Sequence, residues 1–235
     1  MSGTVVRQRK LYEEVAKRLE QRIADGDFAP SDPLPSEREL MEAYGVGRPA
    51  IREALFHLQN LGLVELRSGT RARVTRPTPR SVVDGLSITA RHMLAAPDGI
   101  RNFQGVRVFF ETGLARHAAL HATEQDLADF EAALEDNRES IGDFGRFERT
   151  DVAFHYVLAE IPRNPIFTAI HAAFAEWLLE QRQTTLAPGV DVISYKAHRA
   201  IFEAVAARDA DRADQAMREH LEFVALRYAD VSEAR

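Results

Sequence analysis

Cysteine is absent from this chain of 235 residues. Its absence excludes a disulfide-stapled scaffold, a thiol nucleophile, and any zinc or iron–sulfur site held by thiolates. A metal ion in this protein would therefore need imidazole and carboxylate ligands.

Long hydrophobic runs are also missing. The most apolar stretch, residues 165–179, is too short to span a bilayer and contains His171 and Glu176. Residues 1–10 contain no apolar run of the kind that a signal peptide needs. We therefore expect a cytoplasmic protein with no membrane partner.

An overall basic surplus is lacking as well, because the net charge is −6. Taken alone, this value argues mildly against a nucleic-acid partner. The charge is uneven, however: residues 1–76 carry 13 Lys or Arg and 11 Asp or Glu, a net +2, and the remainder carries −8. The acidity belongs to the second part only, so the first part stays compatible with DNA binding.

Residues 1–76 mix helical patterns with turns and a short strand pair. Ser36 and Glu39 form a capping-box pattern, and Pro49 suits the first turn of a helix. The elements expected in chain order are helices over 10–25, 36–44 and 49–61, then strands over 64–66 and 73–75. This order predicts a winged helix-turn-helix domain.

In a winged helix-turn-helix, the N-terminal end of the second helix of the pair meets the base edges in the major groove. Arg48 and Arg52 lie at that end, one turn apart, and a guanidinium fork matches guanine or a phosphate. Arg38 is placed for a backbone contact, Gly69 lets the wing approach DNA, and Arg71 adds charge beside it. The alternative is that these arginines are ordinary charged surface residues that only keep a small helical domain soluble.

The rest of the chain is predicted to be helical, so the fold class is mainly α. Residues 77–98 form a linker with one helix over 81–95, and residues 99–235 form an all-α bundle. The helices expected in the bundle cover 100–121, 124–139, 145–159, 164–183, 193–207 and 211–229.

Four polar residues of the bundle lie on apolar stripes that should face its core. Asp151 and His155 share one helix face, and His198 and His220 each lie 11 residues from Asp209, in the turn between the last two helices. A buried carboxylate is costly unless it is paired. Three imidazoles and one carboxylate predict a Zn²⁺ site, or Ni²⁺ or Mn²⁺ in octahedral geometry. The alternative for each histidine alone is an ordinary core residue.

Two runs, PSEREL at residues 35–40 and VGRPAIREAL at residues 46–55, resemble the DNA-binding domain of the GntR family of transcription factors. The helical remainder is similar to the FCD effector domain of the FadR-type branch, and the resemblance covers nearly the whole chain. It implies that Arg38, Arg48, Arg52 and the wing glycine contact operator DNA.

The resemblance also implies that the Asp and three His are the metal site of an FCD domain. One departure is that Gly47, Pro49 and Ala50 stand where the family often has small hydroxyl residues. The contacts of such hydroxyls with phosphates are therefore lost, and the operator is expected to differ.

An anionic effector is expected to coordinate the metal, with Arg107 or Arg182 as a clamp for its carboxylate and Asn164 as a hydrogen-bonding group. The chain is most similar to members of the branch that regulate sialic-acid use, which implies N-acetylneuraminate; a uronate or gluconate stays open. The expected protein is a homodimeric repressor on a pseudo-palindromic operator.

Two other functions stay open. One is a metal-dependent hydrolase or lyase fused to a winged helix, for which Glu111 or Glu160 would be the base, although no motif places either beside a metal-bound water. The other is a DNA-binding protein whose helical part only dimerises.

Overall fold

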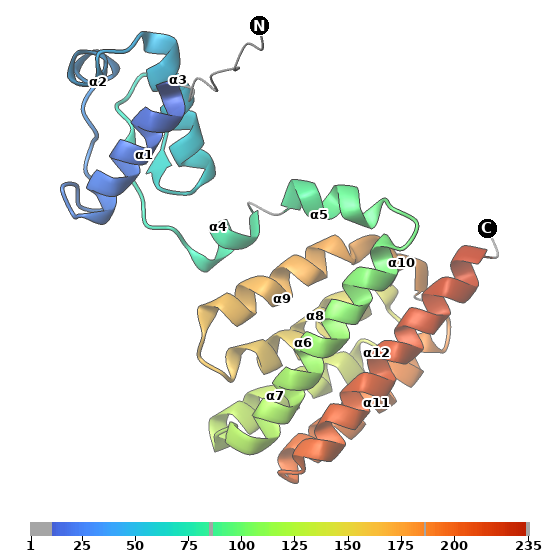
Figure 1. The fold of residues 1–235 in the computed structure, drawn as a ribbon. Helices are drawn as coiled ribbons and strands as arrows, with labels where there is room; N and C mark the ends of the chain where they lie inside the picture. The colour runs from blue at the N-terminus through green and yellow to red at the C-terminus, as the bar shows by residue number, and fades with distance from the viewer. Residues whose placement is uncertain (1–10, 85–86, 186, 234–235) are drawn as a thin grey trace, which may run out of the picture. The chain divides into compact units, whose positions relative to one another are not determined.

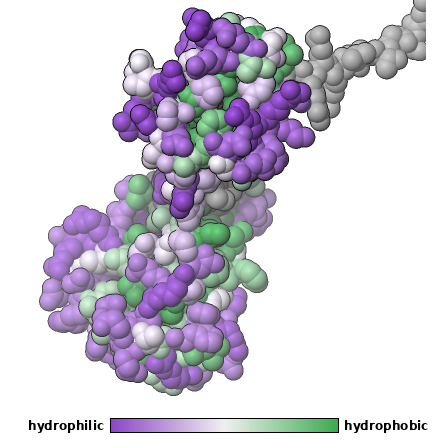
Figure 2. Space-filling view, turned by 90° about the vertical axis from the view of Figure 1, so that its left-hand side faces the viewer, coloured by the Kyte–Doolittle hydropathy of each residue, from purple (hydrophilic) through white to green (hydrophobic). Residues whose placement is uncertain are grey.

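The computed structural model describes residues 11–84, 87–185 and 187–233. The chain divides into two compact units, Met1–Gly85 and Leu86–Arg235. Hydrophilic residues dominate the face shown in Figure 2, with hydrophobic residues in smaller patches. The sequence boundaries at 76 and 98 stay a prediction, and each unit is described by itself below.

The first unit has the element order of a winged helix-turn-helix (Figure 1). Its elements are α1 (Leu11–Ala24), α2 (Glu37–Tyr44), α3 (Arg48–Asn60), β1 (Val64–Glu65), β2 (Arg73–Val74) and α4 (Pro79–Asp84). The two strands pair antiparallel, with Val64 opposite Val74. Buried aliphatic side chains from α1, α2, α3 and the wing form one core.

Local sequence signals account for the helix boundaries of this unit. Ser36 and Glu39 form the complete capping box that begins α2, which satisfies backbone N–H groups that the first turn leaves free. Gly45 ends α2 with φ 65°, a left-handed conformation that glycine adopts without strain. Pro49 occupies the first turn of α3. These signals fix the start of α3, where the predicted DNA contacts begin.

The second unit is a helical bundle, as predicted (Figure 1). Its described helices are α5 (Ser87–Leu94), α6 (Gly99–His121), α7 (Glu124–Glu139), α8 (Phe144–Glu160), α9 (Pro165–Trp177), α10 (Leu179–Thr185), α11 (Val190–Ala206) and α12 (Ala210–Glu233). None of the helices in the described part of the chain is long and apolar enough to cross a membrane.

Two predicted helices are each divided in two. The structure divides the predicted helix over 164–183 into α9 and α10. The break lies at Leu178, where the sequence has no glycine or proline to indicate the end of a helix. The predicted linker helix over 81–95 is replaced by α4 and α5, and residues 85–86 between them lie outside the described residues.

The core of the bundle lies between α6, α7, α8, α11 and α12. Phe130 of α7 stacks on Phe154 of α8, with ring centroids 4.6 Å apart. Phe154 in turn stacks on the ring of His198 from α11 at 4.3 Å. The apolar core therefore runs directly up to the predicted metal residues and holds their rings in place.

Candidate functional site

The predicted DNA contacts lie on the solvent-facing side of α3. Ile51, Ala54, Leu55 and Leu58 are buried on the opposite face. Arg48 and Arg52 therefore both point outward, with side chains 65% and 59% exposed. This is the placement that a recognition helix needs for base or phosphate contacts.

Glu37, which sequence reasoning missed, lies between these two arginines. One carboxylate oxygen is 3.5 Å from Nε of Arg48, and the other is 3.9 Å from Nε of Arg52. Because the carboxylate faces the Nε atoms, the terminal amino groups of both guanidinium groups stay available to DNA. The one sequence feature that could have indicated this contact is the position of Glu37 at the start of α2, the helix before the turn that leads into α3.

The wing and α3 enclose a groove of about 710 Å³, lined by Arg52, Phe56, Gly69 and Arg71 among others. Gly69 has φ 74° and nothing within 4 Å of where a Cβ would stand. The backbone at the wing tip is thus open to close approach. The structure brings Arg52, Gly69 and Arg71 to one groove, while Arg38 is exposed on α2 beside Glu42.

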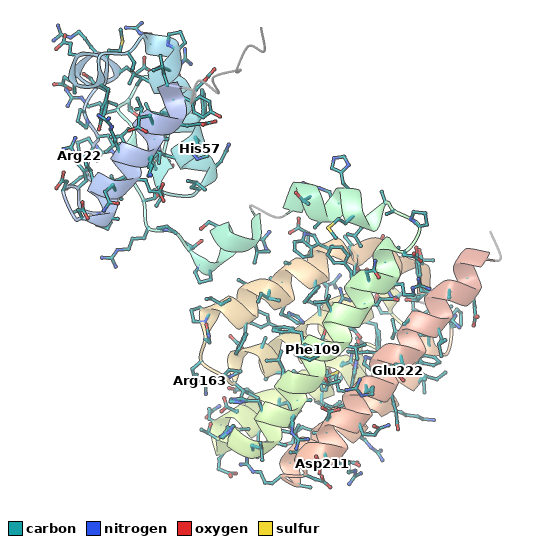
Figure 3. The ribbon with its side chains drawn as sticks, in the orientation of Figure 1. Arg22, His57, Phe109, Arg163, Asp211 and Glu222 are labelled. Atoms are coloured by element: carbon teal, nitrogen blue, oxygen red, sulfur yellow. The ribbon has the colours of Figure 1, made fainter. Side chains whose placement is uncertain are left out.

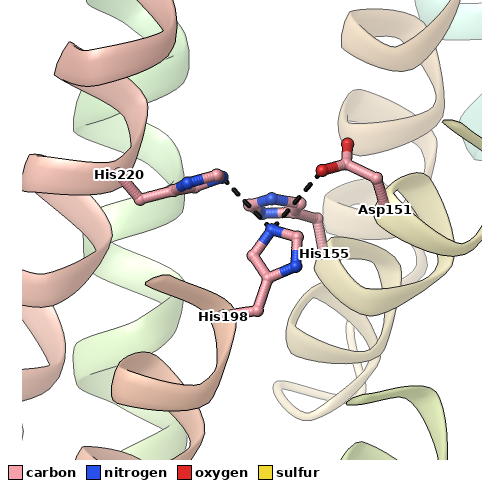
Figure 4. Close-up of side chains that lie close together, drawn as sticks. All are labelled: Asp151, His155, His198 and His220. Atoms are coloured by element: carbon pink, nitrogen blue, oxygen red, sulfur yellow. Dashed lines mark hydrogen bonds and ion pairs between the residues drawn. The ribbon is translucent and has the colours of Figure 1, made fainter. Parts of the chain in front are cut away.

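The four predicted metal ligands converge inside the bundle (Figure 4). Asp151 and His155 come from α8, His198 from α11 and His220 from α12. One potential ligand atom from each lies within 4.8 Å of those from the other three. The Nε2 atom of His198 is 3.3 Å from Nε2 of His220 and 3.4 Å from Oδ1 of Asp151.

Burial controls the protonation of this cluster. The three histidines are almost fully buried. Burial lowers the pKa of His198 to about 3, and that of His220 lies well below its ordinary value for the same reason. Burial alone would raise the pKa of Asp151, but His155, His198 and Arg182 outweigh it and hold that pKa below its usual range. At neutral pH, His198 and His220 therefore offer uncharged imidazoles, and Asp151 offers an ionised carboxylate.

These residues fit a metal ion. Among the described residues, neither ring nitrogen of His155 forms a hydrogen bond although both are buried, and an unsatisfied buried polar atom is costly. Ligand atoms at zinc-like distances in a tetrahedron stand about 3.4 Å apart. The two separations around His198 match that value, and all four potential ligand atoms lie within 4.8 Å of one another, so the cluster could hold a metal ion.

Two polar residues behind the cluster were not predicted as part of it. Nδ1 of His198 lies 2.9 Å from Oδ1 of Asn137, which leaves Nε2 free to face the other ligands. Glu111 of α6 contacts Nδ1 of His155. Sequence reasoning considered Glu111 as the base of a hydrolase, but its carboxylate contacts Nδ1 of His155 and pairs with Arg107.

Both predicted effector arginines are buried beside the cluster. Arg107 and Arg182 line one cavity of about 40 Å³ together with Asp151 and His220. Nε of Arg182 is 3.5 Å from Oδ2 of Asp151. Burial lowers the pKa of Arg182 to about 10, so this guanidinium is still charged at neutral pH.

Asn164 does not reach this cavity. Its side chain accepts a hydrogen bond from the N–H of Ile166 and caps α9, and it lines a separate depression with Asp126 and Arg163. The prediction of an effector contact for Asn164 is therefore not supported by its position. His171, in contrast, is buried and its ring stacks 6.5 Å from that of His155.

The buried histidines predict an acid-labile metal-free protein. Burial lowers the pKa of His171 to about 4, whereas an unfolded histidine titrates near 6.5. Below about pH 6.5 the unfolded chain binds protons that the folded chain does not bind. The free energy of unfolding should therefore fall from about pH 6.5 toward about pH 4. Urea midpoints of metal-free protein should show this decline. His171→Gln should make the decline shallower, because only His198 and His220 still contribute to it, and the exposed control His57→Gln should not. A midpoint of the wild-type protein that stays constant or rises would contradict the prediction.

Family comparison identifies both units. Residues 11–74 match the family model "Bacterial regulatory proteins, gntR family", and residues 105–223 match the FCD domain. The chain belongs to the GntR family. It lies in the FadR-type branch, and it is a DNA-binding transcriptional regulator rather than an enzyme.

Relatives within the GntR family extend over most of the chain. It is 45% identical over 233 residues to the HTH-type transcriptional repressor NanR of Cronobacter sakazakii, covering 97% of this chain and 89% of that protein. It is 43% identical to NanR of Klebsiella aerogenes over 231 residues, with the same coverage. A solved GntR structure from Streptococcus agalactiae shares the fold, with TM-score 0.60, 23% identity, and coverage of 93% and 99%.

Proposed function

We propose that this GntR-family protein is a homodimeric, metal-dependent repressor that a sugar acid releases from operator DNA, with N-acetylneuraminate as the first candidate. The similarity to repressors named NanR supports the repressor assignment. Zinc is the proposed metal, held by Asp151, His155, His198 and His220. The proposed DNA contacts are Arg38, Arg48, Arg52, Gly69 and Arg71.

The observation that carries the proposal is the convergence of two buried arginines and the metal cluster on one cavity. Without a metal, the positive charges of Arg107 and Arg182 are balanced by the carboxylates of Glu111 and Asp151. A divalent cation among uncharged imidazoles adds two positive charges to this buried site. Since excess buried charge is unfavourable, the loaded site favours an anion.

A carboxylate-bearing ligand satisfies each of these groups. Its oxygens would reach an open position on the metal, and Arg107 and Arg182 would bind the same carboxylate through charge-assisted hydrogen bonds. The cavity of about 40 Å³ holds little more than water, whereas pockets for small-molecule ligands measure about 300 Å³ or more. The effector therefore has to bind a more open state, and its preference for that state is what would shift the protein away from DNA.

Homodimerisation belongs to the proposal because a pseudo-palindromic operator needs two recognition helices about one helical turn apart. The outer face of α6 offers a surface for the second copy. Val106 and Leu120 are exposed there, and Phe109, labelled in Figure 3, is 84% exposed. Exposed aromatic and aliphatic residues in a row are typical of a surface that a partner covers.

A thermal-shift screen of sugar acids, with and without a chelator, tests the proposal. N-acetylneuraminate at about 100 times its dissociation constant should stabilise the zinc-loaded protein by about 2.7 kcal/mol, a rise in melting temperature of roughly 5–10 °C. Chelated protein should show no comparable rise. The same acid should release a fluorescent operator duplex.

Glucuronate and gluconate serve as comparison ligands, because they share the carboxylate and differ in the remainder. A shift with one of them alone would reassign the effector. No shift with any sugar acid, in protein that carries zinc, would contradict the effector proposal. Steady consumption of an acid by catalytic amounts of protein would instead favour a hydrolase or lyase.

A further inference from the structure

Glu111 connects the metal cluster to the proposed effector arginine. It lies on α6, one turn after Arg107, and is 1% exposed. Its Oε1 accepts a hydrogen bond of 2.5 Å from Nε of Arg107, and its Oε2 contacts Nδ1 of His155. One buried carboxylate thus contacts both a proposed effector-binding residue, Arg107, and a proposed metal ligand, His155.

Glu111 is ionised in this position. Its Oε1 pairs with the guanidinium of Arg107, which is always charged and favours the ionised form of the carboxylate. An ionised carboxylate accepts at both oxygens and donates at neither. It can therefore accept from Arg107 and His155 at the same time.

The contact with His155 determines which ring nitrogen faces the metal. An uncharged imidazole carries one proton, and the carboxylate favours this proton on Nδ1. The lone pair is then on Nε2, which forms no hydrogen bond and no ion pair among the described residues, whereas Nδ1 has the ion-pair contact with Glu111. A carboxylate behind a metal-binding histidine also fixes the ring and makes its free nitrogen more basic.

The contact with Arg107 determines which part of the guanidinium faces the cavity. Glu111 occupies Nε, so the two terminal amino groups stay available to a ligand carboxylate. The fork is then oriented before the ligand arrives, which lowers the entropy cost of binding.

We propose that Glu111 is a positioning residue that couples metal binding to acid binding, through His155 on one side and Arg107 on the other. The acid half rests on the proposed function, whereas the metal half needs only the cluster. Glutamine cannot replace Glu111 here, because an amide has one acceptor oxygen and one NH₂ donor. It can serve one of the two donors and must turn a donor toward the other.

The experiment compares full-length wild type with Glu111→Gln and a matched control, Asp126→Asn. Asp126 is a buried carboxylate of the same unit that pairs with Arg163 (labelled in Figure 3) and contacts none of the four metal residues in the described structure. Zinc affinity is measured by competition with a chromophoric chelator, without any acid. E111Q should bind zinc about 10–100 times more weakly, and D126N should match wild type within about twofold.

The acid half is measured by titrating N-acetylneuraminate into protein saturated with zinc. Here E111Q should bind about tenfold more weakly than D126N, because Arg107 loses its orientation. Unchanged zinc affinity in E111Q would overturn the proposal, and unchanged acid affinity would overturn its coupling. A wild type that binds zinc but no sugar acid would contradict the effector assignment alone, and the zinc result would still decide the role of Glu111.

The tautomer of His155 gives a test that does not depend on the variant folding. Nitrogen-15 correlation spectra of zinc-loaded wild type should show the proton of His155 on Nδ1. A proton on Nε2 of His155 would overturn the proposal. A wild type that holds no zinc would overturn it together with the proposed function.

Discussion

The variant His198→Ala should lose most of the zinc affinity of the wild-type protein. Structural zinc sites contribute roughly 10–16 kcal/mol of binding free energy in total, so one of four ligands accounts for about 3 kcal/mol, on the order of 10²-fold. His198 is also fully buried against Phe154, so the variant leaves a cavity in the core. Zinc content after dialysis and the zinc-dependent rise in melting temperature should both fall.

His121→Ala is the matched control, because His121 is an exposed histidine on α6 of the same unit. Its removal should change neither zinc content nor the zinc-dependent stabilisation. If His198→Ala bound as much zinc as the wild-type protein, the four residues would not be a metal site, and the histidines would be ordinary residues of the core.

Removal of Arg48 or Arg52 should weaken operator binding strongly. An arginine that contacts a base edge contributes about 1–3 kcal/mol, and the double variant Arg48→Ala/Arg52→Ala should lose roughly 10²-fold or more. Fluorescence anisotropy with operator and scrambled duplexes at fixed salt measures the loss. Loss of a base contact should lower the preference for the operator over the scrambled duplex. Loss of a phosphate contact should weaken binding to both duplexes and reduce the salt slope by about one.

Arg18→Ala is the control for the loss of one positive charge. Arg18 is an exposed arginine of α1 that pairs with Glu14, away from α3 and the wing in sequence. It should leave the operator preference unchanged. Wild-type affinity, with an unchanged salt slope, in the double variant would show that α3 does not carry the DNA contacts.

Local sequence signals were sufficient for much of the fold. The capping box at Ser36, the glycine after α2 and the proline that opens α3 act within one helical turn, so sequence alone shows them. The four cluster residues were also predictable, because i, i+4 spacing and equal distances from one turn are geometric constraints that the sequence carries.

Contacts between distant residues could not be predicted in this way. His198 meets Asn137 across 61 positions, and Glu111 reaches His155 from a different helix. Only packing of the bundle brings such pairs together. The same limit explains Asn164, whose capping signal was correct but whose distance from the metal cluster no local pattern could reveal.

The depth of the metal cluster has a consequence for the timing of regulation. His155 and His198 are fully enclosed, and Asp151 is the most accessible of the four ligands, with its side chain 16% exposed. An ion held there can exchange only as fast as the bundle opens locally. On the timescale of a gene-expression response, a metal bound there would be a permanent part of the protein, and only the concentration of the proposed acid would vary.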